Sequence, residues 1–347
     1  MNDESGRKQQ TPRRHVTPGA AVVDGAPRRG SHFANADPHP RIGNGFWRWQ
    51  RERRAAGLPH APADGYAAFA ERWRTTPDFA YGLEAGVTRP VVWWLGHATV
   101  LLRVGGLHLI TDPHLGRRAS PLAFAGPVRR VPAPARAEEL PPLDAVLVSH
   151  NHYDHLDAAS VRAILHHHPR ATFYAPLGLG DWLRRRGAAR VHELDWWQCR
   201  QHDGVELHCV PAQHWSARGI FDRNRTLWCG WVVRTPGFSF WFAGDTGYTP
   251  RLADIAERLG SPDLAALPIG AYEPRWFMRP QHVDPPEAVR LHEELRVARS
   301  LAVHWGTFEL ADDSLDRPAA ALRGALALTG VSEDAFWLVR QGEARVV

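Results

Sequence analysis

The feature that most constrains this chain is a cluster of histidines and a carboxylate directly after an apolar run. Residues 143–149 have the pattern of a buried strand, and residues 150–157 then read HNHYDHLD. Alternate histidines on an extended turn can point two imidazoles the same way, and the following Asp-His pair offers ligands to a neighbouring point. Imidazole and carboxylate bind zinc, and also iron or manganese. One short loop can therefore supply two adjacent ions.

Three further apolar runs end in residues of the same kind. His214, Asp245 and His304 each follow shortly after such a run. Active sites are commonly built on loops at strand ends, because a rigid scaffold then positions polar groups at an open rim. We therefore expect these three residues to converge with residues 150–155 on one site. An isolated H-x-H pair is more often an ordinary pair of surface or core histidines, whereas H-x-H-x-D-H after a buried strand is far more specific.

From residue 90 onward, the pattern predicts strands interleaved with helices. The expected strands are 91–95, 99–104, 107–111, 143–149, 171–175, 205–211, 226–234, 238–243, 264–268 and 300–304, and the expected helices are 158–168, 250–259 and 285–295. The strands at 99–104 and 107–111 form a hairpin through Gly105 and Gly106. This order suits an α+β fold in which two mixed β-sheets pack between outer helix layers, an αββα sandwich.

The N-terminal third has a different character. Residues 1–40 are rich in Pro, Gly, Arg and Ser without periodicity, so they predict a disordered or loosely attached arm. Residues 41–347 are expected to form a single domain. It begins with a helical extension, residues 41–88, in which aromatic residues among charges predict one or two short helices.

Composition excludes several classes of protein. Hydrophobic residues make up 44% of the chain, enough for a sizeable core, yet no apolar run is long enough to span a membrane. No apolar stretch follows the charged N-terminus, so we expect no secretory signal. Three cysteines without CxxC spacing suggest neither a disulfide framework nor a thiolate zinc site, and favour the cytoplasm. The net charge of +5 is too small to choose between nucleic acid, anionic lipid and simple solubility.

Eight short segments carry a more specific signal. They are WLGHAT (94–99), TDP (111–113), HNHYDHLD (150–157), PAQHW (211–215), FAGDTGY (242–248), IGAYEPRWFM (269–278), QHVDP (281–285) and AVHWGTF (302–308). Together they resemble the metallo-β-lactamase superfamily and, within it, the N-acyl-phosphatidylethanolamine phospholipase D family. The H-x-H-x-D-H motif is common to the superfamily, whereas the HNHYDHLD, PAQHW and IGAYEPRWFM segments are more specific to this family.

The resemblance implies the metallo-β-lactamase fold and a centre of two Zn²⁺ ions, with iron or manganese as alternatives. The ligands implied at matching positions are His150, His152 and His214 for the first ion, Asp154, His155 and His304 for the second, and Asp245 bridging both. A bridging carboxylate is also needed on charge grounds, because two divalent ions close together repel each other.

The resemblance further implies a hydrolase of phospholipase D type. A hydroxide held between two ions would attack phosphorus, releasing an N-acylethanolamine and leaving phosphatidate. The expected catalytic residues are Asp154, which would also orient the hydroxide, Asp245, and His304, which would act first as a ligand. The expected partners are a phospholipid or another phosphodiester, the inner membrane surface as a peripheral contact, and a second copy of the chain as a homodimer. No nucleic acid is expected, because no strongly basic stretch follows residue 310.

Other residues near these motifs leave alternatives open. Tyr153, Gln281 and His282 are candidate substrate contacts, although Tyr153 suits buried packing equally well. His97 and Asp112 either orient ligand imidazoles or belong to the structure of the hairpin. We expect Asp157 to support its loop through hydrogen bonds rather than to bind metal.

Two other functions fit parts of the pattern. A hydrolase of the same fold that acts on a sugar-phosphate lactone or another soluble phosphodiester would share the metal ligands, because fold does not select substrate. The IGAYEPRWFM segment favours the lipid substrate over these. A non-catalytic binding module on the same fold would have lost ligands, whereas all seven expected positions are intact.

Overall fold

The computed structural model describes residues 25–38, 45–81 and 89–347. Its centre is a pair of seven-stranded mixed sheets. The first sheet has the order β16 (Ala344–Val346), β3 (Val91–Trp94), β4 (Val100–Val104), β5 (Leu107–Thr111), β6 (Ala145–Leu147), β7 (Thr172–Pro176) and β8 (Val191–Leu194). Its strands are antiparallel from β16 to β5 and parallel from β5 to β8.

The second sheet repeats this arrangement. Its order is β15 (Phe336–Trp337), β14 (Arg299–Val303), β13 (Leu264–Pro268), β12 (Phe238–Phe242), β11 (Gly230–Thr235), β10 (Val205–Val210) and β9 (Cys199–His202). Here β9 to β12 are antiparallel and β12 to β15 are parallel. Each sheet thus combines an antiparallel half with a parallel half.

Burial along β3 shows how the layers pack. Val92 and Trp94 belong to the core between the sheets, which also contains Trp231 of the second sheet. Val91 and Trp93 belong to a second core on the other face. Because successive side chains of a strand point to opposite faces, a strand that is apolar at every position must be covered on both sides.

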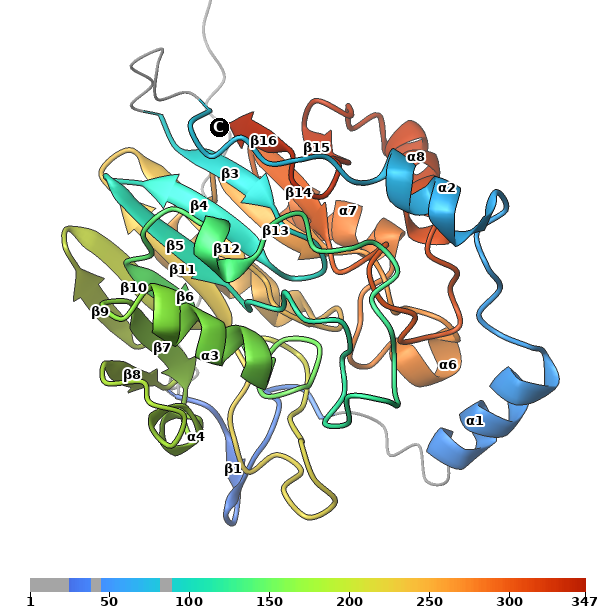
Figure 1. Cartoon of the computed structure of the whole chain (residues 1–347), viewed down its shortest axis with the longest axis horizontal. Helices are drawn as coiled ribbons and strands as arrows, with labels where there is room; N and C mark the ends of the chain where they lie inside the picture. The colour runs from blue at the N-terminus through green and yellow to red at the C-terminus, as the bar shows by residue number, and fades with distance from the viewer. Residues whose placement is uncertain (1–24, 39–44, 82–88) are drawn as a thin grey trace, which may run out of the picture.

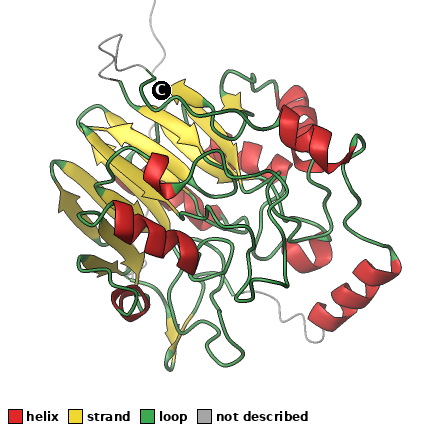
Figure 2. Ribbon diagram, viewed as in Figure 1, coloured by secondary structure: helices red, strands yellow, loops and turns green. Residues whose placement is uncertain are grey.

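Helices provide the outer layers, as Figure 2 shows. The described α-helices are α1 (Gly45–Ala55), α2 (Gly65–Arg72), α3 (Ala158–His167), α4 (Gly180–Arg184), α5 (Ala253–Leu259), α6 (Arg275–Met278), α7 (Pro285–Glu294) and α8 (Arg317–Thr329). Val161 and Ile164 of α3 pack on the outer face of the first sheet, and Leu291 of α7 packs in the larger core. None of the described helices is long and apolar enough to cross a membrane.

Local chemistry sets several boundaries. Gly105 and Gly106, with φ of 59° and 81°, form the predicted turn between β4 and β5. Asp157 begins α3, because its carboxylate accepts hydrogen bonds from the backbone N–H groups of Ala159 and Ser160. The expectation that Asp157 supports its loop is therefore confirmed.

The predicted αββα sandwich is confirmed, and most predicted elements lie within one or two residues of their observed positions. The strand predicted at 226–234 begins instead at Gly230. The cause is that the Cys229 N–H donates to the Ser149 carbonyl and the Leu227 N–H donates to the Leu177 carbonyl, both in the first sheet's loops. These backbone groups are therefore not available to extend the ladder of the second sheet.

The predicted arm, residues 1–40, is described only for residues 25–38. These residues contain a short hairpin, β1 (Arg28–Arg29) and β2 (His32–Phe33), and the Phe33 ring is buried. Asn35 and Asp37 contact the body of the protein. Residues 1–24 and 39–40 lie outside the described residues, so the arm as a whole stays a prediction, but its described part is attached rather than loose.

Candidate metal centre

Four loops bring the expected residues together at one edge of the two sheets. The first follows β6 and carries residues 150–155, while His214, Asp245 and His304 follow β10, β12 and β14. Gly244, with φ of 62°, lets the loop after β12 approach the first sheet closely. A Cβ added there would lie 2.9 Å from the Cβ of Ser149, so a larger residue would push Asp245 away.

Three histidines form the first group of candidate ligands. His152 Nδ1 lies 2.8 Å from His150 Nε2 and 3.2 Å from His214 Nε2. One ligand atom from each of the three residues lies within 4.8 Å of the others. His150 and His214 are buried, and His152 is only partly exposed. The three imidazoles predicted to share one ion therefore converge.

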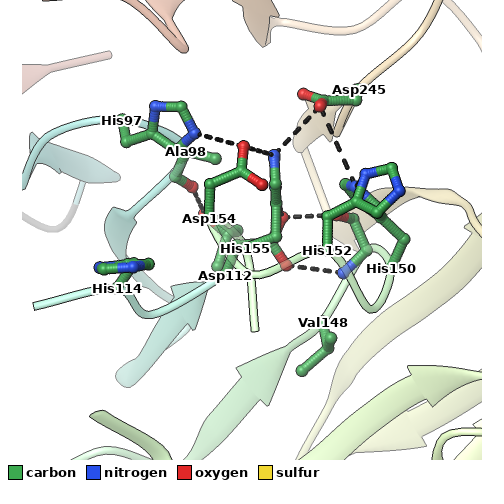
Figure 3. A network of polar contacts seen from close by, with 12 residues as sticks. His97, Ala98, Asp112, His114, Val148, His150, His152, Asp154, His155 and Asp245 are labelled. Carbon is green, nitrogen blue, oxygen red and sulfur yellow. Dashed lines mark hydrogen bonds and ion pairs between the residues drawn. The ribbon is translucent and has the colours of Figure 1, made fainter. Parts of the chain in front are cut away.

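The second group contains a carboxylate. Asp154 Oδ2 lies 3.2 Å from His155 Nε2 and 3.4 Å from His304 Nε2. His97 joins this group, with its Nε2 2.9 Å from the same oxygen (Figure 3). The residues predicted to share the second ion are thus also close together, with one additional histidine that contacts the carboxylate.

Asp245 lies between the two groups. Its Oδ2 is 3.1 Å from His155 Nε2 and 3.7 Å from His214 Nε2, and its Oδ1 is 3.0 Å from His304 Nε2. Figure 3 shows its carboxylate facing the histidines of the 150–155 loop. One carboxylate therefore reaches both groups, which is the position that a bridging ligand requires.

Hydrogen bonds to the far side of the rings fix their orientation. Asp112 Oδ2 lies 2.7 Å from His155 Nδ1, while its Oδ1 accepts from the Ser149 N–H. His214 Nδ1 donates to the Gln281 carbonyl over 2.9 Å. Such partners direct each Nε2 toward the cluster. The structure therefore places Asp112 against a predicted ligand, as one of the two sequence interpretations requires.

Asn35 holds the loop of His214 in a way that the sequence did not suggest. Its side chain donates to the His214 carbonyl and accepts from the His214 N–H, at 2.8 and 3.1 Å. This residue comes from the segment predicted to be a loose arm. No motif distinguishes it in the sequence, because its role depends on where the N-terminal segment crosses the body.

Burial and like charges keep the first group neutral. Burial lowers the pKa of His150 well below its usual value, and the nearby rings of His155 and His152 add to the effect. Burial also lowers the pKa of His152 to about 4 and that of His214 to about 3. These three imidazoles therefore have free lone pairs at neutral pH, as metal binding requires.

In the second group, the effect of nearby carboxylates on the histidine pKa values is larger than the effect of burial. Burial opposes the charged form of His155, but the carboxylates of Asp245 and Asp154 outweigh it and raise its pKa well above the usual value. The same carboxylates outweigh burial at His304 and raise its pKa to about 9. Burial opposes ionisation of Asp154 and Asp245, yet the neighbouring His155 holds the pKa of both well below the usual value.

Several buried polar atoms at the centre are not satisfied by protein groups. Among the described residues, His152 Nε2 and His282 Nδ1 have no hydrogen-bond partner. His304 Nε2 and Asp245 Oδ1 are close together but do not meet hydrogen-bond geometry. Buried polar atoms are normally paired, so converging nitrogen and oxygen atoms without protein partners fit the ligand atoms of a metal site. The buried histidine and aspartate groups are consistent with a dinuclear metal site.

The three candidate substrate contacts have different surroundings. His282 lies in the cluster, with Nδ1 3.9 Å from Asp245 Oδ2. Gln281 contributes its backbone carbonyl to His214, while its amide contacts the Met278 sulfur. Tyr153 donates its hydroxyl to the Arg218 carbonyl. Substrate contact at these residues stays a prediction.

Comparisons with known proteins show the family of this chain. The sequence profile of the family described as "Beta-lactamase superfamily domain" matches residues 108–305. The chain is 44% identical over 227 residues to "N-acyl-phosphatidylethanolamine-hydrolyzing phospholipase D 1" of Caenorhabditis elegans, which covers 62% of this chain and 64% of that protein. It is 35% identical over 236 residues to "N-acyl-phosphatidylethanolamine-hydrolyzing phospholipase D, mitochondrial" of Saccharomyces cerevisiae, covering 66% of this chain and 50% of that protein. The chain thus spans less than two thirds of the length of either relative.

A solved structure supports the fold independently. The "metallo-beta-lactamase fold protein YhfI" of Bacillus subtilis superimposes with a TM-score of 0.52 at 15% identity, covering 74% of this chain and 99% of that one. The family match extends over more than half of the chain, and the two mixed sheets match this architecture. The chain belongs to the beta-lactamase superfamily and has the metallo-β-lactamase fold.

Proposed function

We propose that this protein is a dinuclear zinc hydrolase of phospholipase D type, which releases an N-acylethanolamine and phosphatidate from N-acyl-phosphatidylethanolamine. The observation that carries the proposal is the pair of buried ligand groups that share Asp245. The similarity to two proteins named for hydrolysis of this lipid supports the choice of substrate.

The proposed ligands follow the two groups. His150, His152 and His214 would hold one ion, Asp154, His155 and His304 would hold the other, and Asp245 would contact both. Imidazole and carboxylate ligands of this number suit zinc. When bound, a pair of divalent ions supplies a hydroxide near neutral pH and offsets the charge that develops on the phosphoryl oxygens.

The side chains have distinct tasks in the proposed reaction. Asp154 is the residue we assign to orienting the attacking water, because its carboxylate is held by His97 and faces His155 and His304. The oxygen of water bonds to phosphorus while the bond from phosphorus to the N-acylethanolamine oxygen breaks. A proton passes to that leaving oxygen. Asp245 and His304 are positioned at the same point and complete the proposed catalytic set.

The test combines metal analysis with turnover. The purified protein would be analysed for bound metal and assayed for N-acylethanolamine release, next to a chelated sample and Asp154→Asn. Two zinc ions per chain with chelator-sensitive release are the expected result. Two ions without release in detergent or on vesicles would reject this lipid, and assays on sugar-phosphate lactones and soluble phosphodiesters would then follow. Absence of any bound transition metal would reject the metal centre itself.

A further inference from the structure

Two loops near the metal centre expose large apolar side chains at their tips. The loop of residues 115–130 exposes 80% of Phe124 and 47% of Leu122. The loop of residues 216–225 exposes 89% of Ile220 and 85% of Phe221. Full exposure of such side chains has a free-energy cost that burial would recover. We call these two segments together the two-loop surface.

Contacts place the two-loop surface on both sides of the loop that carries the candidate ligands. On one side, the Leu115 N–H donates to Ser160 Oγ, and Gly116 lies directly against the carboxylate of Asp157. On the other side, Arg218 donates to the carbonyls of Asn151 and Leu156. In Figure 1 the yellow loop before β11 extends below the sheets, and the green loop between β5 and β6 lies to its right. The two loops are therefore attached to the body on either side of the loop that carries the candidate ligands.

Charge on the two-loop surface has a single predominant sign. The two segments contain seven arginines, and Asp222 is their only acidic residue. Arg117, Arg223 and Arg225 are exposed. The Asp222 carboxylate accepts from the backbone N–H groups of Arg218 and Gly219, so it closes its own turn. The outward charge next to the apolar tips is therefore positive.

We propose that the two-loop surface docks on an anionic lipid bilayer, with Phe124, Ile220 and Phe221 inserted among the acyl chains and the exposed arginines at the headgroups. This extends the proposed function, on which it rests for the choice of partner. Small groups of apolar side chains on two separate loops suit insertion into a fluid phase, whereas a protein partner generally requires a contiguous, shape-complementary patch. Arginines beside the tips suit anionic headgroups.

A vesicle-binding experiment tests this surface without any turnover. The full chain and a triple variant, Phe124→Ser, Ile220→Ser and Phe221→Ser, would be sedimented with vesicles of phosphatidylcholine mixed with phosphatidylglycerol. No N-acylated lipid is present. The matched control is Leu328→Ser, because Leu328 is 90% exposed and belongs to α8, which Figure 1 shows near the top of the view, whereas the yellow loop before β11 lies at the bottom. Thermal unfolding and metal content confirm that each variant is folded.

The expected result is a partition coefficient at least about 100-fold lower for the triple variant, with no change for Leu328→Ser. Vesicles of phosphatidylcholine alone should bind the parent protein about tenfold less tightly. Equal binding by the parent and triple variant would overturn the proposal. So would a parent that stays in solution with both vesicle types, which would leave a protein as the occupant of this surface.

The experiments can reject the proposed lipid substrate and the proposed docking surface independently of each other. If the parent binds vesicles through these residues but releases no N-acylethanolamine from detergent-dispersed lipid, docking stands and the proposed substrate is wrong. If that release occurs while the triple variant binds vesicles as the parent does, the substrate stands and the docking surface is wrong.

Discussion

The two halves of the candidate centre balance their charge differently. At His150, His152 and His214, burial outweighs the nearby carboxylate of Asp245 and lowers every pKa, so this half is neutral. In the other half, His155 and His304 have raised pKa values and hold protons that balance the nearby carboxylates. The first half is ready to receive a cation, whereas the second must exchange protons for it. Asp245 is the residue that connects the two.

Removing the shared carboxylate should have the largest effect. Asp245→Asn leaves two cation sites without the negative charge between them, so we expect bound metal to fall in both halves. Turnover of the proposed lipid should drop at least about 1000-fold. Elemental analysis and the release assay measure the two effects. Retention of two ions per chain by this variant would contradict the shared role.

Asp154→Asn should affect one half only. We expect one ion to be retained by the three histidines, with activity reduced about 100-fold or more. The matched variant is His152→Gln, which should instead leave the carboxylate half occupied. Spectroscopy of cobalt-substituted protein distinguishes which half is filled. Equal loss of both ions in both variants would show that the halves do not bind independently.

The two halves should differ in how their zinc affinity depends on pH, because only the second half must release protons. At pH 7 the protons of His155 and His304 must leave, because the pKa of His155 lies well above its usual value and that of His304 is about 9. The zinc affinity of the second half should therefore rise as the pH is raised from 7 toward about 9. The first half should show no such dependence above its pKa values of about 3 to 4. Calorimetric zinc titrations of the metal-free protein in buffers of different ionisation enthalpy count the protons released. If zinc binding to the second half does not depend on pH, this difference between the two halves is contradicted.

Replacing Asp112, which orients the His155 ring, should have a smaller effect on metal binding. Asp112→Asn changes the partner of His155 Nδ1 while leaving all predicted ligands in place. We expect zinc affinity of the carboxylate half to decrease about 10-fold to 100-fold. Competition with a chromophoric chelator measures this. Unchanged affinity would mean that His155 is oriented by its loop alone.

The smallest effect on zinc affinity is expected from loss of the hydrogen bonds between Asn35 and the His214 backbone. Asn35→Ala removes two hydrogen bonds to the His214 backbone but leaves the bond from His214 Nδ1 to Gln281 intact. Zinc affinity of the three-histidine half should fall by only about 3-fold to 10-fold, and the carboxylate half should not change. An equal effect on both halves would point to a general loosening of the fold.

Much of the sheet framework and the convergence of the expected residues could be predicted from sequence. Apolar runs ending in histidine or aspartate mark strand ends, and strand ends share an edge. The sequence left two roles open for His97, orienting ligand imidazoles or forming part of the hairpin, and did not specify its contact with Asp154. The contact of Asn35 with the His214 loop was not predicted at all, because it depends on how distant segments pack. For Tyr153 the sequence left substrate contact and buried packing open; its hydroxyl donates to the Arg218 carbonyl, and substrate contact stays a prediction.

The position of the candidate centre at the shared edge of the two sheets affects the stability of the protein. Residues 150–155 come from the first sheet, whereas His214, Asp245 and His304 come from the second. Ions bound as proposed would cross-link the two sheets of the sandwich, so the sheets could not separate without breaking coordination bonds. Without metal, the halves would be joined by chain connections, side-chain packing and hydrogen bonds such as that from the Cys229 N–H to the Ser149 carbonyl. The lifetime of this protein against heat and proteolysis would then follow the metal supply of its surroundings.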